Sequence, residues 1–422
     1  MADSAKEPAS GGALPSWRSV LGEVFRDRDY RSIVIELFLM ALAEGMVLPY
    51  LTLWVTRGLH GTTTQAAFMF VPSGLVAIAA GIAAGAYTDR VLRRKGAILL
   101  GLMCAGVSFG GLGLTSSYGV ALALYAISGL SHFATVFALL NDTIRSKAKL
   151  GEGRPESGAF ITTLQRTAYS FGWLIGPVVG GLLVERIGYR GVFFTSGGLF
   201  FVGALWAWLQ LSDKAHERTR KRVVSRQLRL PEVGLLALLF LMGLLLFAGD
   251  SGRIMFLPLY LTDRLHASPS VVSLAFSLTV LGELLFLPIA GRVADRVGVV
   301  GVLSAGIAVQ ALFFFGLSVS GTYWEILLLQ VPYAFVVAAS SGVAVVFAQG
   351  SMSSERTGLT TSAYLVSFGL APLVNILLLE LGSGAGRLNR VFDALALSAC
   401  GALALVLLIS RMRRRAVAAP LG

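Results

Sequence analysis

Long apolar runs, each about the length of a membrane-crossing helix, follow one another along almost the whole chain. Crossing the roughly 30 Å hydrocarbon core of a bilayer takes about 20 apolar residues in a helix. Twelve such runs lie at 32–56, 65–87, 97–116, 118–140, 158–184, 191–211, 233–261, 270–290, 299–320, 323–348, 357–380 and 391–410. The pattern predicts an all-α membrane protein with twelve transmembrane helices.

A short loop pattern, Gly-x-x-x-Asp-Arg, follows the second run and recurs 206 residues later after the eighth. The first copy holds Gly85, Asp89, Arg90, Arg93 and Arg94, and the second holds Gly291, Asp295 and Arg296. Duplication of one loop at this separation indicates two homologous halves of six helices, related by pseudo-symmetry.

Polar segments divide the predicted chain into five parts. These are a cytoplasmic segment with an interfacial amphipathic helix (1–31), the first six-helix half (32–211), a basic cytoplasmic linker (212–232), the second half (233–410) and a basic cytoplasmic tail (411–422). The amino-terminal residues are polar and the first apolar run is long enough to span, so we expect no cleaved signal peptide.

Composition and charge agree with burial in lipid. Hydrophobic residues make up 55% of the chain and charged residues 14%, against about 25% charged in soluble domains, and the mean hydropathy is +0.75. The net charge of +12 would suit a nucleic-acid binder, but 27 of the 35 Lys and Arg fall in segments on one side of the predicted topology. The positive-inside rule then places both termini in the cytoplasm, and we expect no nucleic-acid binding.

The repeated loop is a candidate gate. An Asp-Arg pair on a tight cytoplasmic turn can join two helices by charge-assisted hydrogen bonds that form in one conformation and break in another. The alternative is that these are simple loop charges obeying the positive-inside rule, which explains one copy more easily than two in register.

The fifth run carries a glycine and proline pattern: Gly172, Gly176, Pro177, Gly180 and Gly181. Proline removes a backbone donor and bends a helix, while glycines four residues apart let a neighbouring helix approach closely. A purely structural packing helix is the alternative to a role in transport.

With these motifs, the chain resembles the major facilitator superfamily over nearly its whole length. The Gly85 loop is similar to the signature between that family's second and third helices, and the Gly172 to Gly181 pattern is similar to the antiporter signature of its proton-coupled exporters. Two departures are Leu92, where the signature usually has glycine, and a fourth run without the arginine that is common in drug exporters.

A narrower resemblance is to bacterial sugar efflux transporters. The segment from Arg166 to Pro177 is similar to the fifth helix of that group. The group is also resembled by Gly282-Glu283 followed by Pro288, by Leu329-Gln330 and by the stretch 347–349. The resemblance implies a secondary transporter that exports a sugar or glycoside by proton-driven alternating access. Export of an antibiotic or other natural product is the alternative, and a transport-dead sensor or lipid-handling protein of the same fold is a third.

Ionisable residues at bilayer depth are expensive to bury and are therefore candidate functional groups. They are Glu36, Glu44, Arg166, Asp250, Arg253 and Glu283. Glu44 is the first choice for carrying the proton, because it lies near mid-depth with no basic residue close by in its own run. Glu36 lies near the start of that run and is expected to reach the interface.

Two pairs of these charges are expected to interact. Asp250 and Arg253 are one helical turn apart and can pair locally or contact solute. Arg166 and Glu283 each lie about eight residues, or roughly 12 Å, from the cytoplasmic end of a helix. The resemblance places those two helices at the interface between the halves, so we predict an Arg166 to Glu283 contact.

Four aromatic residues are candidates for stacking on a sugar ring, with packing or lipid contact as the alternative: Tyr125, Trp173, Trp324 and Tyr333. His132 in the fourth run is expected to be a packed residue. No metal-ligand cluster, nucleotide-binding loop or serine elbow occurs. We therefore expect a monomeric transporter of the cell membrane, not an enzyme, with a small-molecule substrate, lipid around it and no cofactor beyond the coupling proton.

Replacement of Asp89 tests the gate. Asp89→Asn removes the charge that the loop needs, so transport of the solute should fall strongly while the amount of protein in the membrane stays near normal. Transport assays on vesicles, normalised to protein content, measure both quantities. Transport equal to that of the parent would show that the loop charge does not gate.

Overall fold

The computed structural model describes residues 28–91, 95–131, 155–211, 229–353, 356–382 and 386–418, and within these ranges every regular element is helical. The amino-terminal set comprises α2 (Arg28–Leu53), the π-helical turn η1 (Trp54–Gly58), α3 (Thr63–Phe68), α4 (Phe70–Val91), α5 (Lys95–Leu112), α6 (Tyr118–Ser128) and α8 (Pro155–Gln210). The carboxy-terminal set comprises α9 (Leu230–Leu259), the π-helical turn η2 (Tyr260–Arg264), α10 (Pro269–Val297), α11 (Val299–Val319), α12 (Tyr323–Ala338), the π-helical turn η3 (Ala339–Val343), α13 (Ala344–Gln349), α14 (Thr357–Leu381) and α15 (Arg387–Ala418).

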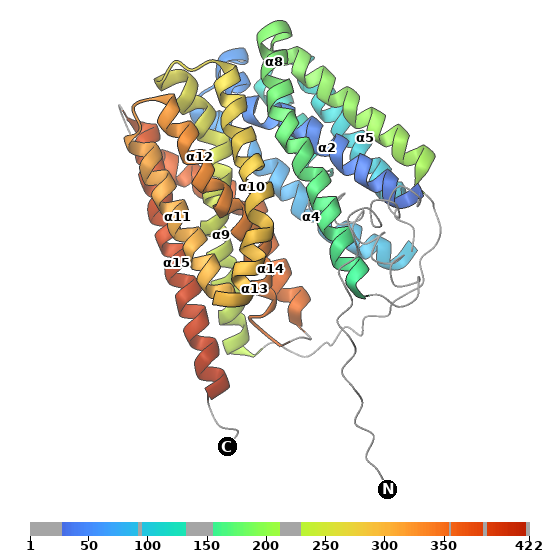
Figure 1. Ribbon diagram of the computed structural model, residues 1–422. Coiled ribbons are helices and arrows are strands. Elements are labelled where there is room, and N and C mark those ends of the chain that lie inside the picture. Colours follow the sequence, from blue (N-terminus) through green and yellow to red (C-terminus); the bar gives the residue numbers. More distant parts are fainter. Residues whose placement is uncertain are drawn as a thin grey trace.

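Ten of the described helical segments are long and apolar enough to cross a membrane. One of them holds two predicted runs, because α8 bends sharply at Gly188, where φ is 71°, and its two limbs diverge from this bend in Figure 1. The fourth run is helical over Tyr118–Ser128, and its remainder lies outside the described residues. Each of the twelve predicted runs thus overlaps a helix, and the chain is a multi-pass membrane protein.

The repeat of 206 residues extends from the sequence motif to the backbone. The π-helical turns η1 and η2 begin at Trp54 and Tyr260, which are 206 residues apart. His60 and His266, again 206 apart, share the left-handed conformation with φ of 53° and 51°, which few residues other than glycine adopt. The same offset makes Glu44 of α2 and Asp250 of α9 equivalent positions.

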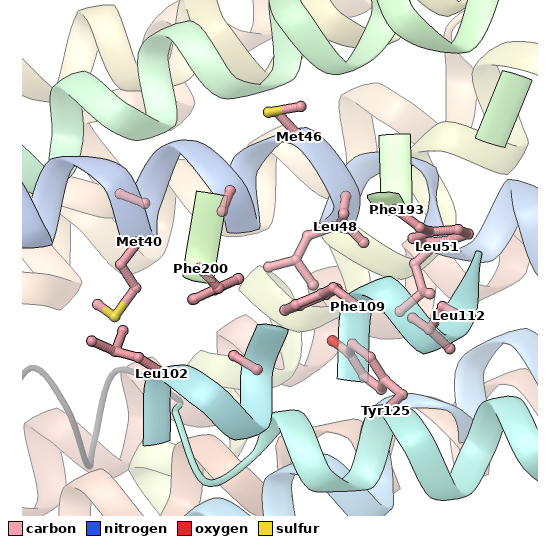
Figure 2. Packing of buried hydrophobic residues seen from close by; sticks show 14 of the residues in the cluster. Met40, Met46, Leu48, Leu51, Leu102, Phe109, Leu112, Tyr125, Phe193 and Phe200 are labelled. Atoms are coloured by element: carbon pink, nitrogen blue, oxygen red, sulfur yellow. The ribbon is translucent and has the colours of Figure 1, made fainter. Parts of the chain in front are cut away.

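The glycines of the fifth run pack the first limb of α8 directly on α2. A Cβ added at Gly172 would lie 2.6 Å from the carbonyl oxygen of Phe38, and one at Gly176 would lie 2.8 Å from that of Leu42. Any larger side chain would force the two backbones apart. Below this contact, α2 and the second limb of α8 enclose an apolar core with α5 and α6, in which Phe109 and Phe200 stack at 5.3 Å (Figure 2).

Several polar contacts join the two sets of helices at one end of the bundle, here called the Arg57 end because α2 and η1 finish there. Polar contacts between the sets at this end include Arg57 with Asp263 at 2.7 Å and the Glu185 carboxylate with the Ser270 hydroxyl at 2.6 Å. The Tyr50 hydroxyl also reaches Ser273 across the interface.

At the opposite end, here called the Arg28 end, the described polar contacts stay within each set. Arg28 donates to Gln210 in the amino-terminal set, and Arg356 pairs with Glu232 in the carboxy-terminal set at 2.7 Å. Among the described residues, polar contacts therefore join the two sets of helices at the Arg57 end, and none joins them at the Arg28 end.

The prediction of a tight turn around each Asp-Arg pair is wrong. Asp89 and Arg90 lie in the last turn of α4, and Asp295 and Arg296 lie in the last turn of α10. In the second copy, no residue of the motif breaks the helix. The helix α10 continues until Gly298, which has a φ of 88° and ends it. Asp295 and Arg296 are exposed, whereas Arg93, Arg94, His132 and the predicted interfacial helix lie outside the described residues.

The close approach of α8 to α2 predicts a position-specific response to added bulk. Gly176→Leu should destabilise the protein by about 1–3 kcal/mol, as overpacking of a tight interior does. Gly198→Leu adds the same group to the same helix at a position with nothing within 4 Å, and should leave the melting temperature of the detergent-purified protein nearly unchanged. Equal melting temperatures for the two variants would argue against this contact.

Candidate functional site

Charged and polar side chains from five helices gather where the two sets meet, near the middle of the bundle. The Arg166 guanidinium of α8 donates to the Glu283 carboxylate of α10 at 2.6 Å. The contact between Arg166 and Glu283 is confirmed. The Glu283 side chain is 6% exposed and that of Arg166 is 24% exposed. The Glu283 carboxylate is therefore more completely shielded from water than the Arg166 side chain.

A second contact joins α2 to the same place. The Tyr169 hydroxyl of α8 donates to Glu44, which is 4% exposed, at 3.0 Å. Tyr169 follows Arg166 by one turn, and the Arg166 guanidinium lies 5.9 Å from the Tyr169 ring centre. Trp173, about one turn further along α8, lies near the Tyr169 hydroxyl. A continuous series of contacts therefore runs from Glu44 through Tyr169 and Arg166 to Glu283.

Arg253 lies between two aromatic rings of the carboxy-terminal set. Its guanidinium is 4.5 Å from the centre of the Phe276 ring and 4.9 Å from that of Tyr333. The same group donates to the Thr279 hydroxyl at 3.3 Å and to the Gln330 side-chain oxygen at 3.2 Å. Cation–π contacts and hydrogen bonds thus hold a charge that is only 5% exposed.

Asp250 takes a tyrosine in preference to a direct ion pair with its helical neighbour. The Tyr333 hydroxyl donates to Asp250 at 3.3 Å, and among the described residues no ion pair joins Asp250 to Arg253. Arg253 is turned into its aromatic contacts, which leaves Asp250 as an electrostatic neighbour of Arg253, Glu283 and Arg166. Asp250 therefore belongs to the same cluster of charges.

Four members of this cluster were not selected as site residues from the sequence: Tyr169, Phe276, Thr279 and Gln330. Phe276 and Thr279 carry no signal in an apolar helix, and Tyr169 and Gln330 entered only through segments of the family resemblance. For Gln330, an uncharged amide in the middle of an apolar run was the one available signal, because burying an amide requires hydrogen-bond partners.

Glu36, which was expected to reach the interface, is instead buried. Its side chain is 1% exposed and lies against Gly203 of α8, and neither carboxylate oxygen has a partner among the described residues.

The four aromatic candidates fall in different places. Tyr333 contacts both Asp250 and Arg253, and Trp173 joins the cluster through Tyr169. Tyr125 packs edge-on against Phe70 and Phe109 in the apolar core. Trp324 is 61% exposed in the first turn of α12. Tyr333 and Trp173 therefore lie at the charged cluster, and Tyr125 packs in the apolar core with Glu44 as its charged neighbour.

The cluster can bind a polar solute and take up or release a proton, since it combines carboxylates, guanidiniums, an amide and hydroxyls at the meeting of two sets of helices. Within the described residues, no group of three or more His, Cys, Asp or Glu side chains is placed to hold a metal ion. The arrangement has the composition of a carrier site.

Comparison with known proteins gives a consistent family. The family model of the Major Facilitator Superfamily matches residues 2–165, 37–249 and 239–420. "Sugar efflux transporter A" of Dickeya chrysanthemi is 22% identical over 80% of this chain and 86% of its own length. "Multidrug resistance protein MdtG" of Enterobacter lignolyticus (strain SCF1) is 26% identical over 72% of each chain. The crystal structure of a mutant of the nucleoside transporter NupG matches the fold with a TM-score of 0.78 and 14% identity, over 91% of this chain and all of that one.

The Arg166 to Glu283 contact predicts coupled effects on stability and transport. Arg166→Gln or Glu283→Gln should each lower stability by about 1–3 kcal/mol, since each leaves the partner charge unpaired, and the partial exposure of Arg166 moderates the loss. The charge swap should recover part of it. A double-mutant cycle on melting temperature measures the coupling, and additive effects would contradict the contact.

Proposed function

The chain belongs to the Major Facilitator Superfamily and is a membrane transporter and not an enzyme, and we propose that it exports a small polar solute such as a sugar or glycoside in exchange for protons. The observation that carries this proposal is the series of contacts from Glu44 through Tyr169 and Arg166 to Glu283. This series links a buried carboxylate in one set of helices to a buried carboxylate in the other set. Protonation of either carboxylate therefore changes the contacts that hold the two sets together.

Alternating access follows from where the sets touch. We place the Arg28 end in the cytoplasm by the positive-inside rule, with the protein in the cell membrane as a monomer, and infer that the present conformation faces inward. The outward conformation then requires the Arg57 to Asp263 and Tyr50 to Ser273 contacts to break. In that state Asp89 and Asp295, which lie on helices of the two sets, form the inner gate with basic neighbours. Gly172, Gly176, Gly180 and Pro177 of the antiporter pattern keep α8 close to α2 while the sets rock.

Export of an antibiotic or other natural product is the second candidate. The similarity to a protein named for multidrug resistance, at 26% identity over 72% of the chain, supports it. The similarity to a sugar efflux transporter covers more of this chain, and the abundance of hydrogen-bonding groups at mid-bundle suits a hydroxylated solute. A transport-dead sensor is disfavoured because both copies of the gate motif keep their charges.

Efflux measurements decide between these candidates. Vesicles containing the protein are loaded with labelled lactose and glucosides or with fluorescent drugs, and efflux is followed with and without a protonophore. We expect protonophore-sensitive efflux of the sugars. Drug efflux alone would favour the second candidate, and insensitivity to the protonophore would contradict proton coupling.

Glu44 is our choice for the residue that carries the proton. Glu44→Gln should retain solute binding but lose acceleration of efflux by a pH gradient, because the amide keeps a hydrogen bond with Tyr169 and cannot exchange a proton. The exposed Asp393 of α15 supplies the control, and Asp393→Asn should behave as the parent. If Glu44→Gln responds normally to the gradient while Glu283→Gln does not, then Glu283 is the carrier.

A further inference from the structure

Arg253 and Asp250 lie one turn apart in α9 but do not form an ion pair. Side chains at this spacing in a helix are neighbours, and a carboxylate binds a guanidinium more strongly than a neutral oxygen does. Among the described residues, no ion pair joins the two groups, and Asp250 accepts a hydrogen bond from Tyr333 at 3.3 Å. Another group must therefore hold the Arg253 guanidinium.

Gln330 of α12 supplies the oxygen that Arg253 contacts instead. The Gln330 side-chain oxygen accepts hydrogen bonds from the Arg253 guanidinium at 3.2 Å and from the Thr279 hydroxyl at 2.9 Å. The Thr279 hydroxyl in turn accepts a hydrogen bond from Arg253 at 3.3 Å. The three side chains therefore form a closed set of hydrogen bonds that holds the guanidinium against α10 and α12.

The partners of the Gln330 amide fix the direction of its oxygen. The side chain is fully buried, and its nitrogen donates to the Ile326 carbonyl one turn earlier at 3.0 Å. A reversed amide would point its nitrogen donors at the donors of Arg253 and would lose the contact with Ile326. The oxygen of Gln330 is therefore a fixed acceptor for Arg253.

The internal repeat associates the amide with the arginine. Val47 lies 206 residues before Arg253, and it is apolar. Leu124 lies 206 residues before Gln330, and it is apolar as well. The half of the chain that lacks the arginine thus also lacks the amide. In that half, the acid at the position equivalent to Asp250 has no arginine one turn away, so no group is needed to hold one.

We propose that Gln330 is a positioning residue that keeps the Arg253 guanidinium from pairing with Asp250 and so leaves the Asp250 carboxylate available to the transported solute. The proposal rests on the transport function proposed above and names a residue that controls its site. A direct pair between Asp250 and Arg253 would satisfy both charges in a desolvated place, where such a pair is costly to break. A carboxylate paired in this way would no longer be offered to a polar solute in each cycle.

Replacement of the amide by an unbranched apolar side chain of similar length tests this role. Gln330→Met removes the oxygen, so Arg253 should turn to Asp250, and the coupling between these two residues should increase about tenfold, as an equilibrium constant, over that in the parent. A double-mutant cycle with Asp250→Asn and Arg253→Gln measures the coupling in both backgrounds, by equilibrium unfolding of the purified full-length protein in SDS. The measurement requires no solute.

Two further variants separate positioning from a loss of packing. Gln330→Glu restores an oxygen acceptor at the same place, so the coupling should return to the value of the parent. Gln310→Met removes another buried amide, which donates to the Leu246 carbonyl of α9 at 3.0 Å and has no charged partner among the described residues. This control should leave the coupling unchanged.

Equal coupling in Gln330→Met and in the parent overturns the proposal. Failure of Gln330→Met to fold also overturns it, because the amide would then be required for packing. If Arg253→Gln does not fold, a structure of Gln330→Met decides the same question. The Arg253 guanidinium should then lie within about 4 Å of the Asp250 carboxylate, the range of an ion pair, and a guanidinium still held against α10 and α12 would contradict the proposal.

Transport distinguishes this proposal from the broader one. In proteoliposomes, efflux of labelled lactose driven by a pH gradient should fall about tenfold in Gln330→Met, since a buried ion pair must then be broken in each cycle. Gln310→Met should transport as the parent does. Increased coupling with unchanged efflux would overturn the role of Gln330 in transport. Absence of lactose efflux by the parent would contradict the proposed export of sugars, and the unfolding cycle would still decide which group Arg253 contacts.

Discussion

Removing charge from water is the constraint on which the rest of this structure depends. The described residues bury several ionisable groups among apolar helices, and each of these groups needs partners to stay charged there. Arg166 finds Glu283 in the other set of helices, and Arg253 finds two rings, a hydroxyl and an amide. The requirement for partners fixes how the two sets meet at mid-bundle and concentrates ionisable chemistry in one place.

The contacts that the proposed transport cycle breaks differ in strength from those that it keeps. Arg57 and Asp263 are 44% and 51% exposed, and such pairs contribute about 0–1 kcal/mol, which suits a contact made and lost in every cycle. The α2 to α8 contact is set by glycines whose replacement would meet backbone atoms. We therefore expect it to persist when, in the proposed cycle, the weaker contacts at the Arg57 end open.

The repeat gives equivalent scaffolds with unequal chemistry. Glu44 and Asp250 occupy the same position in α2 and α9, and each carboxylate accepts a hydrogen bond from a tyrosine. Their neighbours differ, because Tyr169 comes from the first limb of α8 and Tyr333 from α12, and only Asp250 has arginines nearby. Duplication followed by divergence of surroundings therefore leaves two equivalent carboxylates in different electrostatic environments.

The sequence alone determined the membrane-spanning architecture, the repeat, the close-packing glycines and the set of buried charges. These features are local along the chain: the thickness of the bilayer sets the length of each run, and charge at bilayer depth is rare enough to be conspicuous. For Arg166 and Glu283, depth together with the family resemblance was enough to predict the contact.

Only the tertiary structure decided which groups share the site. Arg253 turns to Phe276 and Tyr333 and away from a direct pair with Asp250, Glu44 takes Tyr169, and Tyr125 faces the apolar core. It also showed that the Asp-Arg pairs continue their helices and that the bundle is joined at the Arg57 end. The physical reason is that partner choice depends on how each helix is rotated about its axis and packed against distant segments, and neither is encoded by spacing within one run.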